Sequence, residues 1–309
     1  MFYRLKDKFR RFRFMMETRG ILSAPALVAW PDSGLALLTQ LQHKDVRMAL
    51  IALKSFAIRM PVGAVYILSD GSLTPDDFDL LRRHIPSVTL LRLEDHQSRH
   101  CPMGGTWERL LSIARLVKDH YVIQLDSDTL TLGDIPEIAE CVTANRSFVI
   151  GTWDNQELET MASRQSEAAV LMEKMTKAPH IQLAAEASFN KLKRYNELRY
   201  VRGCSGFSGF AKGGFSREFV EEISGQMSDA LGDRWREWGS EQVMSNIVVA
   251  NTPNCRVLPH PKYSDCRKMR LPETVFVHFI GSCRFNDGNY ARLGKSVIAR
   301  LSASNMSNT

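Results

Sequence analysis

Two carboxylates separated by one residue stand directly after a short apolar run. Residues 121–125 read YVIQL, and Asp126 and Asp128 follow at once. Such a run predicts a buried central strand, and open α/β sheets bind ligands beyond the carboxyl ends of their strands. Two acids this close repel each other unless a cation lies between them. Hard oxygen ligands suit Mg²⁺ or Mn²⁺, which keep open positions for phosphate oxygens. The pattern predicts a divalent-metal site, although a bare Asp-x-Asp is also typical of a solvated turn.

Two later side chains are of types that fit such a site, and their roles there are implied by a family resemblance. His278 lies at the end of another apolar run, and Arg284 follows shortly after it. An imidazole nitrogen can join two carboxylates around a metal ion, and a guanidinium donates charge-assisted hydrogen bonds to phosphate. A histidine at a strand end can also be an ordinary hydrogen-bonded residue. The metal-site interpretation of His278 therefore depends on the Asp pair.

The elements that must position these residues alternate between strands and helices, which favours a parallel sheet. Strands are predicted at 35–39, 64–68, 88–93, 121–125, 148–152 and 275–279, and helices at 43–59, after Thr74 and at 106–118. Residues of about 156–199 lack strand alternation and are predicted to form a helical insertion. We expect an α/β fold: one Rossmann-like domain with a mostly parallel central sheet over residues 21–298, followed by a flexible tail at 299–309.

Residues 1–20 are predicted to form a basic amphipathic helix. Apolar side chains recur at spacings of three and four; they are Phe2, Leu5, Phe9, Phe12 and Met16. Basic side chains occupy the remaining surface; they are Arg4, Lys6, Lys8, Arg10, Arg11 and Arg13. This pattern is typical of a helix lying in an anionic membrane surface. The alternative is a helix packed on the domain with a solvated basic face.

The composition is that of a soluble globular protein, with 44% hydrophobic and 24% charged residues among 309. No apolar run approaches the roughly 20 residues that cross a bilayer, and no signal peptide fits the start of the chain. We expect a cytoplasmic protein, peripheral on the inner face of the membrane if the first helix binds lipid. The net charge of +6 resides mostly in residues 1–13. Since a nucleic-acid binder spreads basic residues over its folded body, no nucleic-acid partner is expected.

The six cysteines are scattered without a CxxC pair. This spacing suggests neither a zinc site nor a disulfide framework. We therefore expect the cysteines to be mostly reduced.

The segment 121–135, YVIQLDSDTLTLGDI, resembles the heart of nucleotide-sugar glycosyltransferases of the glycogenin and lipopolysaccharide galactosyltransferase type. In that family an apolar strand runs into Asp-x-Asp, then Thr with an apolar pair, then Asp-Ile. Upstream, Arg109, or less well aligned Arg115, stands where the family has a basic residue facing the donor.

Three downstream motifs follow in the family's order. Residues 205–210, SGFSGF, resemble its Asn-Ser-Gly strand without the Asn, and small residues there let backbone approach the sugar. Residues 239–242, GSEQ, with Asn246, resemble its Asp-Gln-x-x-x-Asn helix start with Glu in place of Asp, although they also fit a plain helix N-terminus. Residues 278–284, HFIGSCR, resemble its His-x-x-Gly-x-x-Lys with Arg in place of Lys, and Phe285-Asn286 stand where the family has Pro-Trp.

The resemblance implies a glycosyltransferase A fold, a uridine diphosphate sugar as donor, and Mn²⁺ or Mg²⁺ as cofactor. It implies retention of anomeric configuration and transfer to a glycan, lipid-linked or protein acceptor. The implied metal ligands are Asp126, Asp128 and His278. Donor contacts are implied for Arg109, Arg284, Ser208, Gly209 and Gly281, and Glu241 or Gln242 would line the sugar face.

Three alternatives remain at this point. Within glycosyltransferases, Glu241 could act as the base of an inverting enzyme. A nucleotidyltransferase would also bind diphosphate and metal, but it usually carries a Gly-rich basic loop after the first strand, and residues 39–44 read TQLQHK. A noncatalytic adaptor built around the first helix would show no metal-dependent nucleotide binding.

Overall fold

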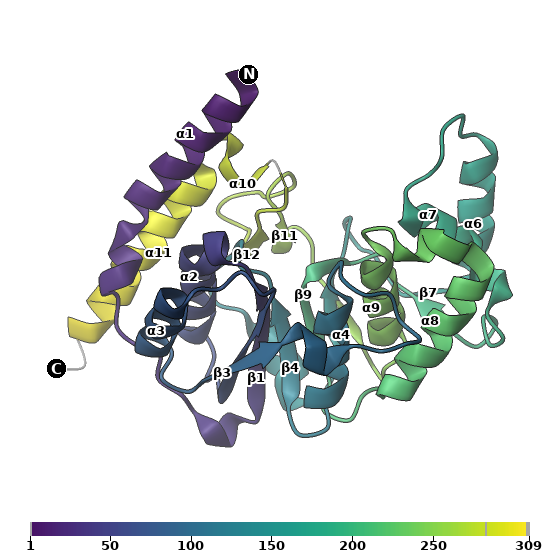
Figure 1. The fold of residues 1–309 in the computed structure, drawn as a ribbon, viewed down its shortest axis with the longest axis horizontal. Coiled ribbons are helices and arrows are strands. Elements are labelled where there is room, and N and C mark those ends of the chain that lie inside the picture. Colours follow the sequence, from purple (N-terminus) through teal and green to yellow (C-terminus); the bar gives the residue numbers. More distant parts are fainter. Residues whose placement is uncertain (1, 282, 307–309) are drawn as a thin grey trace. The chain divides into compact units, whose positions relative to one another are not determined.

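A computed structural model describes residues 2–281 and 283–306, with side chains placed for residues 8–281 and 283–303. The chain forms two compact units, each assembled from separate stretches of sequence (Figure 1). Unit 1 consists of Met1–Arg92, Leu125–Ala139 and Pro261–Thr309. Unit 2 consists of Leu93–Gln124 and Glu140–His260.

Three parallel strands form the sheet of unit 1: β1 (Leu35–Leu41), β2 (Ala64–Ser69) and β3 (Val88–Arg92). Two helices connect them, α2 (Val46–Ala57) and α3 (Pro75–His84). Helix α3 begins with a capping box in which Thr74 and Asp77 exchange side-chain to backbone hydrogen bonds. This arrangement satisfies two amide donors that a helix start otherwise leaves unpaired.

A second, three-stranded sheet of unit 1 contains β11 (Tyr263–Asp265), β12 (Phe276–His278) and β5 (Thr129–Thr131). Strand β12 pairs parallel with β11 and antiparallel with β5. Helix α5 (Pro136–Thr143) follows β5 and includes residues of both units.

The first and last helices of the chain lie side by side in unit 1. Helix α1 (Phe2–Glu17) contacts α10 (Cys283–Asn286) and lies beside α11 (Asn289–Met306), as Figure 1 shows. Phe14 packs α1 onto the unit: its ring stacks on Tyr290 at 4.5 Å and meets Phe285 edge-on at 5.5 Å. The predicted N-terminal helix is therefore present, and one side of it belongs to the folded unit.

The flexible tail predicted at 299–309 is wrong for most of its length. Helix α11 continues to Met306, and the last three residues lie outside the described chain. Val297, Ile298 and Leu301 are buried at helical spacing, so the Ser- and Asn-rich composition of the segment was misleading. Apolar contacts on one face stabilise this helix despite its polar remainder.

The sheet of unit 2 has the strand order β10 (Arg256–Leu258), β6 (Phe148–Ile150), β9 (Cys204–Phe210) and β4 (Tyr121–Leu125, whose last residue belongs to unit 1). Strands β10 and β6 are parallel, whereas β6 and β9 are antiparallel. Helices α4 (Trp107–Leu116), α8 (Arg217–Leu231) and α9 (Ser240–Ala250) contact one another around a buried pair of indoles, Trp107 and Trp235.

The predicted insertion at 156–199 contains two helices, α6 (Met161–Glu173) and α7 (Ile181–Ala187). A short antiparallel pair brackets them, β7 (Glu159–Thr160) with β8 (Arg199–Tyr200). The remaining helical turns are of the 3₁₀ type: η1 (Arg19–Ser23), η2 (Pro31–Ser33), η3 (His43–Asp45), η4 (Leu93–His96), η5 (Phe189–Lys191) and η6 (Gly232–Arg236).

The predicted α/β fold with a mostly parallel sheet is confirmed. Strand β4 has the predicted bounds, and most other boundaries shift by one or two residues. Within residues 2–281 and 283–306, no helix is both long and apolar enough to cross a bilayer.

Candidate functional site

Three predicted metal ligands lie together in unit 1. Asp126, Asp128 and His278 each offer one ligand atom, and these atoms lie within 4.8 Å of one another. Nε2 of His278 is 3.2 Å from Oδ1 of Asp128 and 3.7 Å from Oδ2 of Asp126. Strand register explains the meeting, because His278 pairs with Thr129 across the antiparallel β12–β5 ladder. Two carboxylates and one imidazole are ligands that fit Mn²⁺ or Mg²⁺.

The turn between β4 and β5 is fixed by hydrogen bonds on several sides. The hydroxyl of Thr129 donates to the carbonyl of Asp126 at 2.8 Å, and the amide of Phe279 donates to the carbonyl of Asp128 at 2.8 Å. Tyr290 of α11 donates its hydroxyl to the carbonyl of Ser127 at 3.3 Å. The two acids therefore project from a backbone held by two other elements of the same unit.

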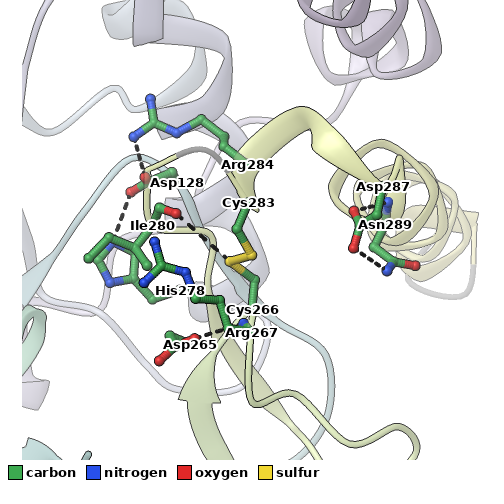
Figure 2. The surroundings of a disulfide bond; sticks show 10 residues. All are labelled: Asp128, Asp265, Cys266, Arg267, His278, Ile280, Cys283, Arg284, Asp287 and Asn289. Carbon is green, nitrogen blue, oxygen red and sulfur yellow. Dashed lines mark hydrogen bonds and ion pairs between the residues drawn. A yellow bond between two sulfur atoms is a disulfide. The ribbon is translucent and has the colours of Figure 1, made fainter.

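Arg284 contacts the same acid from the other side. Figure 2 shows Asp128 between His278 and Arg284, and the guanidinium donates to Oδ2 of Asp128. Burial would raise the pKa of the Asp128 carboxyl, but His278 and Arg284 together lower it below its ordinary value. Burial likewise opposes the charge of Arg284, and the carboxylates of Asp128 and Asp45 outweigh it and raise the pKa of the guanidinium. Both groups stay ionised at neutral pH.

A disulfide joins Cys266 to Cys283 next to this cluster, with Cα atoms 6.2 Å apart (Figure 2). The expectation of mostly reduced cysteines is wrong for this pair. Cys266 follows β11 and donates its amide to the carbonyl of His278 at 2.9 Å, while Cys283 begins α10 just before Arg284. The parallel pairing of β11 and β12 brings the two sulfurs together, and cysteine spacing alone carries no signal for it.

A third carboxylate near the cluster was missed by the sequence reasoning. Asp45 follows β1 at the start of α2 and is buried. Its carboxylate accepts a hydrogen bond from the side-chain amide (Nε2) of Gln42 at 2.8 Å. Burial raises the pKa of its carboxyl, Asp128 adds to this effect, and Arg284 opposes it. The available signal was an acid directly after the carboxyl end of a strand, which also fits an ordinary helix start.

Gly281 occupies the turn between β12 and α10. Its φ of +60° lies in the left-handed region, which favours glycine. Its carbonyl accepts the amide of Arg284 at 3.3 Å. This gives Gly281 a backbone role in presenting Arg284, whereas a direct donor contact stays a prediction.

Other predicted residues lie in unit 2. Arg109 of α4 pairs with Glu241 of α9 at 3.4 Å, and the two side chains are only 5% and 2% exposed. Thr106 donates its hydroxyl to the same Glu241 carboxylate at 2.8 Å and has a φ of +79°, directly after Gly104 and Gly105, which also have positive φ. Arg115, the less well aligned candidate, is exposed.

The motifs at residues 205–210 and 239–246 contact each other at the start of β9. Gln242 accepts a hydrogen bond from Ser205 at 3.4 Å, and the side-chain amide of Asn246 donates to the carbonyl of Gly203 at 3.2 Å. The similarity of GSEQ and SGFSGF to the family's motifs therefore corresponds to a physical contact between α9 and β9.

Farther along β9 the small residues have a packing reason. Ser208 is fully buried, with its hydroxyl 3.4 Å from the carbonyl of Cys204. A Cβ on Gly209 would lie 2.2 Å from the Phe148 ring and 2.6 Å from the Tyr121 hydroxyl. Gly209 is thus required by its neighbours within unit 2, and donor contacts of these two residues stay predictions.

Comparisons with known proteins show which solved structures have a similar fold. No protein-family model matches the chain, and no curated protein matches it. Among solved structures it is similar to the bifunctional glycosyltransferase WbbM, with a TM-score of 0.50 and 12% identity, over 89% of this chain and 51% of WbbM. The glycosyltransferase GlyE of Streptococcus pneumoniae TIGR4 has a TM-score of 0.52 and 13% identity, over 88% of this chain and 63% of GlyE.

An active-site mutant of LgtC is also similar, with a TM-score of 0.50 and 10% identity, over 87% of this chain and 95% of LgtC. The fold is thus the one found in these glycosyltransferases, which confirms the resemblance at the level of fold. The chain spans about half of WbbM and less than two thirds of GlyE.

Proposed function

We propose that the protein is a metal-dependent glycosyltransferase that moves a sugar from a nucleotide diphosphate, most simply uridine diphosphate, to a glycan, lipid-linked or protein acceptor. The observation that carries this proposal is the cluster of Asp126, Asp128 and His278 at the carboxyl end of a buried strand. The shared fold supports it.

The closeness of the carboxylates in the cluster favours a bound cation. Ligand atoms of Asp126 and Asp128 lie within 4.8 Å of each other, and the buried carboxylate of Asp45 is near enough to Asp128 for the two to repel. Neighbouring carboxylates destabilise one another unless positive charge compensates them. A divalent ion held by Asp126, Asp128 and His278 would neutralise charge on the departing diphosphate.

The chain's own residues would bind the donor diphosphate and orient the donor. Arg284 has five N–H donors in a fixed fork, and its contact with Asp128 leaves donors for a phosphate oxygen. The turn at Gly281 sets the position of this side chain. We assign donor binding also to Arg109, Ser208 and Gly209 on the strength of the family resemblance.

The environment of Glu241 bears on the stereochemistry. A general base must reach the acceptor hydroxyl, but Glu241 is buried, paired with Arg109 and bonded to Thr106. These contacts support a positioning role beside Gln242 and a retaining reaction. Anomeric analysis of the product tests this assignment. A product of inverted configuration would contradict it and would favour Glu241 as the general base.

We include association with an anionic membrane surface in the proposal. The predicted apolar stripe of α1 is exposed where it is described: Phe9, Phe12 and Met16 are 67%, 62% and 46% exposed. Phe2 and Leu5, the other members, have side chains outside the described part. An exposed apolar stripe flanked by basic residues fits a helix at a lipid surface.

The test is a donor screen by thermal shift. Uridine, guanosine and adenosine diphosphate sugars are each added with Mn²⁺, with Mg²⁺ or with a chelator, because a ligand of the native state raises the unfolding temperature. We expect a metal-dependent shift with a uridine diphosphate sugar, absent in Asp128→Asn. A shift that persists with chelator, or none with any donor, contradicts the proposal.

A further inference from the structure

A cavity of about 260 Å³ lies in unit 1, between α1 and the segment formed by α10 and the start of α11. Its lining is unusually rich in arginine for its size. The lining residues are Phe9, Arg10, Arg13, Phe14, Arg284, Phe285, Asn286, Asp287, Gly288 and Ala291.

The lining holds three guanidiniums and one carboxylate, that of Asp287; the guanidinium of Arg284 pairs with Asp128, so Arg10 and Arg13 are the two that α1 contributes to the cavity. Asp287 accepts hydrogen bonds from the amide and the side chain of Asn289. Arg10 donates to Asn286 at 2.6 Å, and Arg13 pairs with Glu17 at 2.5 Å. Each guanidinium carries five N–H donors, more than these contacts use. The cavity can therefore supply several charge-assisted hydrogen bonds to an anion.

The cavity also adjoins the exposed stripe of α1. Phe9 belongs to both, whereas Phe14 points into the unit and stacks on Tyr290. On a helix of 3.6 residues per turn, the stripe of Phe9, Phe12 and Met16 lies on the side opposite Phe14. Arg10 and Arg13 lie between these two sides. A ligand in this cavity would contact the guanidiniums of Arg10 and Arg13 and, next to them, the exposed apolar stripe of α1.

We propose that this cavity binds the phosphate group of an anionic membrane phospholipid, whose acyl chains lie along Phe9 and Phe12. This inference rests on the membrane association proposed above and adds a specific headgroup site to it. An amphiphile matches both halves of the surface, since its phosphate and hydrocarbon are covalently joined. A free phosphate would match the arginines only and would leave the apolar stripe in water.

The experiment measures binding of the full chain to vesicles by co-sedimentation. The vesicles are phosphatidylcholine alone or mixed with phosphatidylglycerol. The pocket variant carries Arg10→Gln and Arg13→Gln. Its charge-matched control carries Lys8→Gln and Arg19→Gln, which remove two exposed charges near the same surface and do not line the cavity. Arg10→Lys with Arg13→Lys keeps the charge and removes the planar fork.

We expect both glutamine variants to lose diffuse attraction, about fivefold in affinity for each charge. The pocket variant should lose about a further tenfold, because hydrogen bonds to a charged phosphate are lost with the charge. Added salt should remove the diffuse loss in the control and leave the extra loss in the pocket variant. The lysine variant should fall between the wild type and the glutamine pocket variant.

Two results would overturn the proposal. One is equal weakening of the pocket variant and its control; the other is binding of soluble glycerophosphate as tightly as phosphatidylglycerol vesicles, which would assign the cavity to free phosphates. The stripe is tested separately with Phe9→Ser plus Phe12→Ser against Val28→Ser plus Trp30→Ser, exposed apolar residues outside α1. Wild-type binding by the Phe variant would show that the stripe does not contact the acyl chains and would also overturn the proposal. Failure of the wild type to bind any vesicle would remove membrane association itself, and the donor screen stands independently of both.

Discussion

The two units each bury a small cluster of charged side chains, and the clusters differ in how their charges are compensated. In unit 1, Asp126 and Asp128 lie close together beside the imidazole of His278 and the guanidinium of Arg284. In unit 2, the carboxylate of Glu241 pairs with the guanidinium of Arg109 and accepts a hydrogen bond from the hydroxyl of Thr106. The first cluster brings two carboxylates together, whereas the second joins one carboxylate to one guanidinium.

This difference separates a proposed metal site from an ion pair better than burial does. Both clusters are largely shielded from water, so burial alone ranks them together. Opposite charges in a buried ion pair compensate each other, whereas two neighbouring carboxylates repel each other unless a cation lies between them. The comparison yields four predictions, given from the largest expected effect to the smallest.

Replacing Asp128 with Asn should lower the rate of sugar transfer on the order of a thousandfold, because the metal loses a charged ligand. Turnover of the donor with Mn²⁺ measures this effect. Asp134→Asn is the matched control, since Asp134 lies in the same segment, is exposed and pairs with Arg59 at the surface. Near-normal activity in Asp128→Asn would remove the unit 1 cluster from the mechanism.

Replacing Glu241 with Gln should cost about 3 kcal/mol of unfolding free energy, because Arg109 is left buried without its anionic partner. Urea unfolding measures this value. Glu197→Gln breaks an exposed pair with Arg194 and should change the free energy by less than about 0.5 kcal/mol. Stability equal to wild type in Glu241→Gln would show that the buried guanidinium of Arg109 does not depend on the charge of Glu241.

Lys54 extends the comparison to a buried cation whose hydrogen-bond partners among the described residues are two backbone carbonyls and an imidazole. Its ammonium donates to the carbonyls of Ala24 and Pro25 and lies 2.8 Å from Nδ1 of His84. Burial lowers the pKa of Lys54 from 10.5 to about 8. Between these values the unfolded chain binds a proton that the folded chain does not, so stability rises with pH across the window and is lost as pH falls through it.

The expected gain for the wild type is about 2 kcal/mol between about pH 8 and about pH 9.5. Lys54→Met should lack this rise, so the difference in unfolding free energy between the two proteins should change across that window. Urea unfolding at several pH values measures it. Parallel curves for the two proteins would mean that Lys54 remains charged when buried.

Replacing His278 with Ala should raise the Mn²⁺ concentration for half-maximal thermal shift by about tenfold or more, since one of three ligands is lost. Excess Mn²⁺ should then partly restore transfer. His43→Ala, which removes a half-exposed histidine of the same unit bonded to Asp77, should leave the metal titration unchanged. An unchanged titration in His278→Ala would make it a structural histidine.

The sequence was sufficient for features that depend on local pattern. A nearly all-apolar run that stops at an acid predicted β4 with its observed bounds. The alternation of predicted strands and helices along the chain predicted the α/β class. The three proposed metal ligands could be named because Asp126 and Asp128 directly follow an apolar run, and His278 ends another run in a motif that resembles the family's. Arg284 was found through its spacing from His278.

Features that depend on pairing between distant segments could not be predicted in this way. The disulfide between Cys266 and Cys283 follows from strand pairing, and the burial of Asp45 follows from its neighbours in space. Helical periodicity identified the stripe of α1 but not the side that the unit would cover. Phe14 was assigned to neither face, because its partners Phe285 and Tyr290 lie at the other end of the chain.

Three stacked rings connect that helix to the metal cluster. Phe14 stacks on Tyr290 at 4.5 Å, and Tyr290 stacks on Phe279, the residue after His278, at 4.4 Å. Close-packed rings do not compress, so a displacement of α1 must be taken up by Tyr290 or by the end of β12. The position of the first helix is therefore connected by direct ring contacts to Phe279, the neighbour of the histidine that we assign to the metal. A chain shortened to begin after Glu17 would lack the first ring and would leave Tyr290 uncovered.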